Sequence, residues 1–245
     1  MTTYQGSVRR VLRWPVKSLR GEEVEQGRFD GRGMAGDRAY ALIDERDNHA
    51  GRTLTVRQRA EMLHWRSAYD GGDAPVLTAP DGTSWAWDHP ELPGELSRSL
   101  GVPLSLRAAD GQQDRGPTVL VTFESSRAGL EEELGREVDL LRFRPNLHLE
   151  LDAPAFDEED WAAGTVLSAG EAEFTVAGDV AGPCIRCAVP SWDPTGRERW
   201  PALQKWLIDR HRNIFGVIMV VTRPGTVRRG DPVSVTVDRT VTSAV

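Results

Sequence analysis

Glycine and proline recur along the whole of this 245-residue chain and divide it into many short segments. The 24 glycines and 15 prolines are spread through the sequence, which holds no internal repeat and no long linker. Because both residue types interrupt regular structure, few stretches are long enough for extended helices. Short segments bounded by turns are typical of β-rich proteins. The sequence therefore predicts a fold that is mainly β with a few helices.

Several segments alternate apolar and polar residues, as a half-buried strand requires. In the segment Leu147–Leu151 the three leucines share one face, whereas residues 217–221 form an apolar run suited to a strand buried on both faces. We expect strands at 7–13, 38–44, 104–108, 118–123, 139–151, 165–167, 173–177, 216–222 and 232–237.

Two helices and one boundary between domains are also predicted. Ser125 or Ser126 can cap a helix that ends at Gly135, and residues 200–212 follow helical spacing after Pro201 near the first turn. Residues 109–116 are polar and rich in turn-forming types. We therefore divide the chain into a front domain, 1–110, and a back domain, 111–240.

Composition excludes several classes of protein. The formal net charge of −7 argues against broad nucleic-acid binding, which needs a basic surface to neutralise phosphates. No apolar run approaches the roughly 18 residues needed to span a bilayer, and the polar N-terminus lacks the apolar core of a secretory signal. We expect a soluble, cytoplasmic protein that binds neither nucleic acid nor membrane.

The chain has two cysteines, Cys184 and Cys187, in the segment Gly-Pro-Cys-Ile-Arg-Cys. Two cysteines cannot form a disulfide framework. Nor can they supply a four-cysteine zinc site or iron–sulfur cluster within one chain. The C-x-x-C spacing therefore needs another interpretation.

Four interpretations of this pair compete. A redox dithiol opens a helix, but Pro190 follows closely and the preceding segment is strand-like. Half of a zinc site lacks a second cysteine pair. Two buried structural thiols are the plainest alternative, since free cysteine is among the most buried residue types. The fourth interpretation is a thiolate ligand for a soft metal, with Arg186 lowering the thiol pKa of Cys187.

Cationic side chains stand beside turns in the front domain and in one back-domain strand. Any one of them is typical of a solvated surface residue. Together they offer the forked arginine donors, lysine charge and hydroxyl or amide groups that bind an anionic phosphate. The residues concerned are Lys17 with Ser18, Arg38, Arg57, Arg142, Arg144 and Asn146.

These motifs resemble a known family. The front segments VLRWPVKSLRGEEV, GMAGDRAYALID and TLTVRQRAEM resemble the N-terminal β-barrel domain of MOSC proteins. The back segments RFRPNLHLE, FDEEDW, GPCIRCAVPSWDPTG, FGVIMVV and GTVRRGDPV resemble the MOSC domain itself. The match covers nearly the whole chain in the family's order. The combination of PVKS, GDR, RFRPN and an RC followed by a D-P-x-G turn is specific.

The resemblance implies a β-barrel MOSC core with an N-terminal β-barrel-like domain packed against it. Similar members include the amidoxime-reducing components and their bacterial relatives, which hold a pyranopterin molybdenum cofactor (molybdopterin) between the two domains. The family's metal ligand matches Cys187, which is then also the expected catalytic residue. The matching cofactor-binding positions are Lys17, Ser18, Arg38, Arg144 and Asn146, assisted by Arg57 and Arg186, with Ser125 and Ser126 at a helix start that suits anion binding.

The implied activity is that of a molybdenum-dependent oxidoreductase acting on N-hydroxylated or N-oxygenated small molecules. The chain has no cysteines for the ferredoxin domain that some bacterial relatives carry, so electrons are expected from a separate ferredoxin, flavoprotein or cytochrome. An alternative is a sulfur-carrier or cofactor-handling protein that uses Cys187 as persulfide or ligand. A third is a non-catalytic domain, against which the joint presence of Lys17, Arg38, Arg144, Asn146 and Cys187 weighs.

Overall fold

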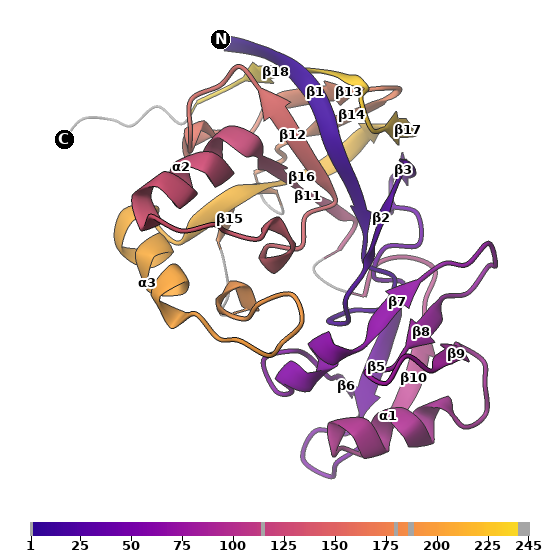
Figure 1. Cartoon of the computed structure of the whole chain (residues 1–245). Helices are drawn as coiled ribbons and strands as arrows, with labels where there is room; N and C mark the ends of the chain where they lie inside the picture. The colour runs from indigo at the N-terminus through magenta and orange to yellow at the C-terminus, as the bar shows by residue number, and fades with distance from the viewer. Residues whose placement is uncertain (1, 114–115, 179–180, 186–188, 240–245) are drawn as a thin grey trace.

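The fold is mainly β, as the sequence predicts. The computed structural model describes residues 2–113, 116–178, 181–185 and 189–239. In this part of the chain, two of the three α-helices lie against a β-barrel, and the third lies with several short strands to one side of it (Figure 1). No helix within these ranges is long and apolar enough to cross a membrane.

Seven strands close into the barrel, and the β11–β16 pair completes the circle. The β11–β12 pair is parallel, and the other barrel pairs are antiparallel. In spatial order the strands are β11 (Thr118–Phe123), β12 (Leu147–Leu151), β1 (Thr2–Arg13), β18 (Pro232–Val237), β13 (Val166–Ala169), β14 (Ala172–Thr175) and β16 (Ile214–Arg223). Two shorter strands extend the sheet: β2 (Glu22–Val24) pairs with β1, and β15 (Gly182–Ile185) pairs with β16.

The barrel interior is apolar because inward positions alternate along each strand. Leu147, Leu149 and Leu151 are all buried, as their shared face predicts. Phe29 and Phe174 meet edge to face inside this core, with ring centroids 5.2 Å apart. Closing the sheet leaves no unpaired central edge, which removes the main aggregation hazard of a β fold.

The first strand of the chain belongs to the barrel of the back half. β1 pairs with β12 on one side and with β18 on the other. Two further early strands, β3 (Gln26–Asp30) and β4 (Gly33–Met34), form a small sheet with β17 (Gly225–Arg228). Front and back segments of the sequence therefore share sheets.

The N-terminal domain proper holds two three-stranded sheets and one helix (Figure 1, lower right). One sheet has the order β10 (Leu104–Ala108), β5 (Tyr40–Asp44) and β6 (Arg52–Thr53), and the other has the order β7 (Arg66–Ala68), β8 (Val76–Thr78) and β9 (Ser84–Ala86). Helix α1 (Leu92–Leu100) and the 3-10 helix η1 (Ala60–His64) contribute Leu92, Leu96 and Met62 to a second apolar core.

Two helices cover the barrel beside strand β15. Helix α2 (Glu124–Leu134) follows β11, and helix α3 (Pro201–Arg210) precedes β16. Three 3-10 turns lie between them in the sequence: η2 (Leu140–Arg142), η3 (Asp157–Asp160) and η4 (Val189–Ser191). Phe143 and Phe215 stack with ring centroids 3.8 Å apart under this layer.

Each expected strand overlaps an observed one, but the expected strand at 139–151 is wrong over most of its length. Only Leu147–Leu151 is extended. The Asp139 carboxylate accepts a hydrogen bond of 2.8 Å from the backbone N–H of Leu141 and starts the turn η2. Arg144 then takes a left-handed backbone conformation (φ 58°), which no strand can continue.

The expected serine cap of α2 is also wrong. The helix begins at Glu124 after Phe123, and no side chain caps it. Its end at Gly135 is confirmed, because this glycine has φ 60° and closes the helix in the left-handed region.

His211 joins α3 to α2 and η3. The buried imidazole lies between two carboxylates, with Nε2 2.8 Å from Glu133 Oε2 and Nδ1 2.8 Å from Glu159 Oε1. Its ring stacks on Phe156 at a centroid distance of 3.8 Å. Burial lowers the pKa of His211, but the bonds to Glu159 and Glu133 outweigh it, so the net shift is upward.

We therefore expect His211 to titrate above the ordinary histidine value of about 6.5. Glu133→Gln should lower its pKa, because one of the two stabilising carboxylates is removed. Histidine NMR titration measures this, and Glu132→Gln, an exposed neighbour on the same helix, is the control. A wild-type pKa at or below 6.5 would contradict the arrangement.

Candidate functional site

The chain bends sharply at Trp14 and Pro15, where β1 leaves the barrel. The indole of Trp14 is buried, and its Nε1 donates a hydrogen bond of 2.8 Å to the carbonyl of Pro145. The backbone N–H of Trp14 donates to Asp37 Oδ1 at 2.8 Å. These hydrogen bonds thus join three segments of the chain at the bend, those that contain Trp14, Asp37 and Pro145.

Arg38 reaches across this bend. Its Nη1 donates to Asp37 Oδ2 and, at 3.4 Å, to Asn146 Oδ1, while its Nη2 donates to the carbonyl of Arg144 at 3.1 Å. The side chain is 12% exposed. Arg38 also has a left-handed backbone conformation (φ 50°), which costs energy in a residue with a side chain and persists only where neighbours fix it.

Arg144 lies against the same tryptophan. Its guanidinium carbon is 4.2 Å from the centroid of the Trp14 ring, within the range of a cation–π contact. Pro145 follows, and the Trp14 bond to the Pro145 carbonyl holds this turn in place. Arg144 has a left-handed backbone conformation (φ 58°), and β12 begins three residues later at Leu147.

Lys17 and Ser18 follow the bend. The backbone N–H of Lys17 donates to the carbonyl of Tyr40 at 2.8 Å, and Nζ donates to the carbonyl of Gln113 at 3.0 Å. Gln113 in turn donates its N–H to the carbonyl of Arg38 at 2.9 Å. The structure therefore brings Lys17, Ser18, Arg38 and Arg144 together around one bend, and we call these four residues the bend cluster.

Asn146 supports the bend cluster from inside the barrel. Its side chain is fully buried, where Oδ1 accepts from the N–H of Leu120 at 3.2 Å and Nδ2 donates to the carbonyl of Leu12 at 3.4 Å. The amide links β11 to β1 and orients Arg38. Asn146 therefore positions a cation rather than facing a ligand itself.

The two serines of α2 differ from each other. Ser126 Oγ donates to Glu158 Oε2 at 2.7 Å and accepts from the N–H of Phe156 at 2.9 Å, and the residue is fully buried. Its hydroxyl is thus engaged within the protein. Ser125 Oγ is buried without a hydrogen-bond partner among the described residues. Of the pair, only Ser125 has a hydroxyl group that no described residue engages, and that oxygen is itself buried.

The remaining expected site residues lie elsewhere or outside the described ranges. Arg57 is exposed and lines a separate groove of about 770 Å³ together with Arg59, Arg98, Trp192 and Arg199. Arg186 and Cys187 lie outside the described residues. Cys184, on β15, is buried. Within the described ranges no three histidine, cysteine, aspartate or glutamate side chains gather as a metal site.

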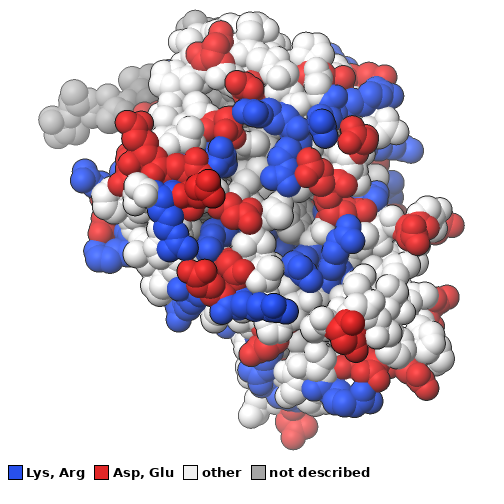
Figure 2. Space-filling model, in the orientation of Figure 1, with Lys and Arg blue, Asp and Glu red and all other residues white. Residues whose placement is uncertain are grey.

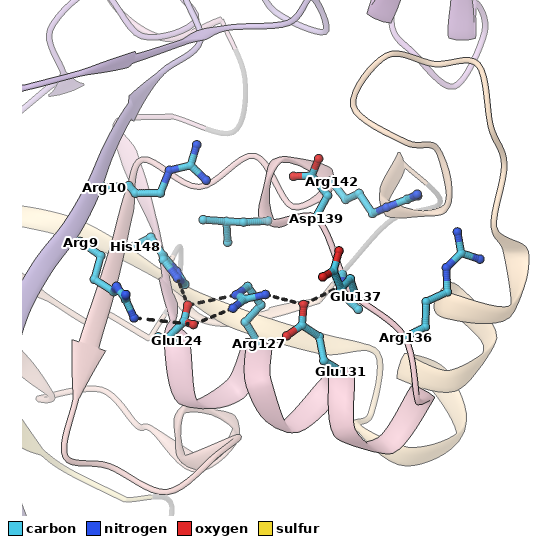
Figure 3. Close-up of a pocket in the computed structure, with 12 residues that line it drawn as sticks. Arg9, Arg10, Glu124, Arg127, Glu131, Arg136, Glu137, Asp139, Arg142 and His148 are labelled. Atoms are coloured by element: carbon cyan, nitrogen blue, oxygen red, sulfur yellow. Dashed lines mark hydrogen bonds and ion pairs between the residues drawn. The ribbon is translucent and has the colours of Figure 1, made fainter.

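A cleft of about 920 Å³ opens between β1, α2 and the segment that contains η2. Positive and negative side chains interleave across this face of the molecule (Figure 2). Figure 3 shows Glu124, Arg127 and Glu131 in a row along α2, facing Arg10, Asp139 and Arg142 across the cleft. The lining is strongly polar, which suits a small polar ligand.

Glu124 is the centre of a charge network in this cleft. Its carboxylate accepts from Arg127 Nη2 at 2.6 Å and lies 2.8 Å from His148 Nε2. The Arg127 bond, against the effect of burial and with help from His148, lowers the pKa of Glu124 to about 2. Glu124 is therefore ionised at neutral pH and fixes charge in the cleft rather than donating a proton.

His148 links that network to the barrel. Nδ1 lies 3.0 Å from Thr122 Oγ1, so hydroxyl, imidazole and carboxylate stand in a row. Burial lowers the pKa of His148 despite the neighbouring Glu124, which favours the neutral ring. Thr122 is fully buried and cannot reach a substrate. The row is therefore a structural connection between β11 and β12 and not a nucleophilic triad.

Arg142 is among the cations that the sequence groups as suited to an anionic phosphate, although the family resemblance implies no role for it. Its buried guanidinium donates to the carbonyls of Pro190 and Ser191 at 3.3 and 3.4 Å. It lines the cleft and also holds η4, which begins at Val189, two residues after Cys187 in the sequence. Arg142 thus connects the cleft to η4.

Comparison with known proteins shows that two domain models of one family match this chain. The model of the MOSC N-terminal beta barrel domain matches residues 5–114, and that of the MOSC domain matches residues 111–234. The YuaD protein from Bacillus subtilis aligns over 97% of this chain and 99% of its own, with 13% identity and a TM-score of 0.50. YiiM from Escherichia coli aligns over 94% of this chain and 73% of its own, with 13% identity and a TM-score of 0.43. No curated protein sequence matches.

Proposed function

Because the chain belongs to the MOSC family, with both the N-terminal barrel domain and the MOSC domain, we propose that it binds a molybdenum cofactor and reduces N-hydroxylated or N-oxygenated small molecules. The bend cluster is the observation that carries this proposal. It gathers an ammonium group and two guanidinium groups from three distant segments at the junction of the two domains.

These residues fit the phosphate of a pyranopterin cofactor. Forked guanidinium donors, a lysine charge and a hydroxyl group are what a phosphate monoester binds. We assign that phosphate to the bend cluster, with Asn146 and Asp37 orienting Arg38. Ser125 and Arg57 remain proposed contacts to other parts of the cofactor.

Cys187 is the proposed protein ligand of the metal. The adjacent Arg186 favours the thiolate form, which is the form that binds metals. When bound, the cofactor supplies two-electron removal of oxygen from an N–O bond. The protein's own task is to bind, orient and set the electrostatics.

The 920 Å³ cleft is the proposed substrate site. Reduction of an N-hydroxyl group releases water and consumes two protons, which must come through polar groups of the lining. Glu124 is held ionised by Arg127 and His148, so it is not the proton donor. Its role is to keep Arg127 and His148 in place. Electrons come from a separate ferredoxin, flavoprotein or cytochrome.

The direct test is elemental analysis of protein from a host that makes the cofactor. We expect about one molybdenum per chain and turnover of benzamidoxime with reduced methyl viologen, which replaces the natural donor. Arg38→Ala should lower the metal content, because it removes a proposed phosphate ligand and the three side-chain bonds that shape the bend. Arg28→Ala, an exposed arginine on β3, is the matched control.

Absence of molybdenum together with a persulfide on Cys187, seen as an added sulfur in the intact mass, would favour the sulfur-carrier alternative. Absence of both would leave the proposal without support. If the protein contains molybdenum but turns over no N-hydroxylated compound, the proposed cofactor binding would stand and the proposed reaction would be refuted.

A further inference from the structure

A smaller cavity of about 300 Å³ opens beside Trp14. Leu12, Trp14 and Leu63 give it apolar walls, and four arginines, Arg10, Arg20, Arg66 and Arg144, line it as well. Arg10 also lines the 920 Å³ cleft, so the two cavities adjoin. A ligand in the cleft can therefore extend a second group into this cavity.

The acidic residues of the cavity are already matched. Glu23 pairs with Arg10 at 2.8 Å. Glu22 pairs at 2.8 Å with Arg13, which is not part of the lining, and accepts from the N–H of Tyr69 at 3.1 Å. Arg20 and Arg66 therefore face the cavity with no carboxylate of the lining to neutralise them.

The backbones of Arg20 and Arg66 are joined by a parallel β-bridge, so both side chains enter the same cavity. Arg20 Nη2 donates to the carbonyl of His64 at 3.0 Å, whereas its Nε is buried with no partner in the described ranges. Arg66 is exposed, and its side chain makes no hydrogen bond or ion pair with another described residue. Burial, then the charges of Arg66 and Arg197, lower the pKa of Arg20, and the charge of Asp193, which is not part of the lining, offsets them only in part.

Two adjacent cations, one of them partly desolvated, destabilise a protein unless an anion compensates them. We propose that Arg20 and Arg66 bind a carboxylate or phosphate group of the substrate, so that the preferred substrates are small anionic N-hydroxylated compounds. A cavity of about 300 Å³ with apolar walls has room for one ring or one phosphoryl group. This inference rests on the proposed function for the reacting end of the substrate, but its binding test does not.

Calorimetric titration with two reaction products tests the site without turnover. 4-Amidinobenzoate carries the carboxylate, and benzamidine lacks it. We expect the carboxylate to strengthen binding about tenfold, as a charge-assisted guanidinium bond does. Arg66→Ala should abolish that difference, and the control Arg28→Ala should keep it. Equal binding of both probes to the wild-type protein would overturn the proposal.

A second source of the anion is the phosphate of the cofactor, and two preparations separate the sources. Protein made with and without molybdate in a cofactor-producing host should bind 4-amidinobenzoate equally well if the site serves the substrate. Loss of binding in the metal-loaded protein, together with lower molybdenum content in Arg66→Ala, would assign the cavity to the cofactor and overturn the proposal.

Kinetics with 4-carboxybenzamidoxime and benzamidoxime complete the test on the loaded protein. Arg66→Ala should raise KM about tenfold for the anionic substrate, with kcat unchanged, and should leave benzamidoxime unaffected. A fall in kcat for both substrates would contradict a substrate-binding role. If no substrate turns over, the proposed reaction fails, whereas the calorimetric difference still decides the anion site.

Discussion

Glu158→Ala is expected to lower the free energy of unfolding by about 2–4 kcal/mol at pH 6, the sum of two buried bonds lost. Glu158, in η3, is fully enclosed, and its two oxygens bind different elements. Oε2 accepts from Ser126 Oγ on α2 at 2.7 Å, and Oε1 accepts from the N–H of Gly216 on β16 at 3.2 Å. Alanine would leave both donors buried without a partner. Urea unfolding measures the loss.

Glu158→Gln separates the hydrogen bonds from the charge. Burial raises the pKa of Glu158 from 4.5 to about 7, against the bonds from Ser126 and Gly216. The folded state therefore keeps a proton that the unfolded chain releases, and stability falls as pH rises from about 4.5 to 7. At 1.36 kcal/mol per pKa unit, this shift corresponds to about 3 kcal/mol.

We expect the free energy of unfolding of Glu158→Gln to equal that of the wild type at pH 5. As the pH rises toward 7, the variant should lack the part of the stability loss that Glu158 causes. His211, whose folded pKa is also raised, contributes a decline of the same sign in both proteins, so the difference between them isolates Glu158. Identical pH profiles for the two proteins would show that Glu158 is not a buried proton carrier.

Cys187→Ala is expected to reduce turnover of N-hydroxylated substrates at least about a hundredfold, roughly 2.7 kcal/mol of transition-state stabilisation. The reason is chemical: alanine cannot supply the thiolate that the proposed metal centre needs. Molybdenum content should fall as well. Turnover with reduced methyl viologen and elemental analysis measure the two effects, and a thermal melt checks that the variant is folded.

Cys184→Ala is the matched control for that variant. Cys184 is a small buried residue on β15, so alanine should cost a modest amount of stability and little activity. Full turnover in Cys187→Ala would refute the ligand assignment. Equal loss in both variants would show that the two thiols act as a pair.

The strands of the barrel were predictable because their inward faces alternate along the sequence. Leu147, Leu149 and Leu151 show this, since they stand at every second position and all three are buried. The preceding turn was not predictable in the same way. Its conformation depends on Arg144 in the left-handed region and on the long-range bond from Trp14 to Pro145, and neither is visible in local periodicity.

The residues of the candidate site could be predicted from the sequence, but their arrangement in space could not. Resemblance singled out Lys17, Arg38 and Arg144, whereas only the folded chain brings them around one bend. Glu158 lies in the FDEEDW motif, which carried the resemblance without suggesting a buried carboxyl group. Arg20 and Arg66 escaped notice because they are 46 positions apart, and only the β-bridge makes them neighbours.

The position of β1 has a consequence for the order of folding during synthesis. Residues 2–13 leave the ribosome well before their partners, Leu147–Leu151 and Pro232–Val237. The N-terminal domain, whose two sheets pair locally between residues 40 and 108, can form in the meantime. The barrel can close only after β18 has been released, because β18 pairs with both β1 and β13. A gene cut at residue 110 would therefore yield no intact MOSC barrel, because the back half alone would expose the edges of β12 and β18 where β1 belongs.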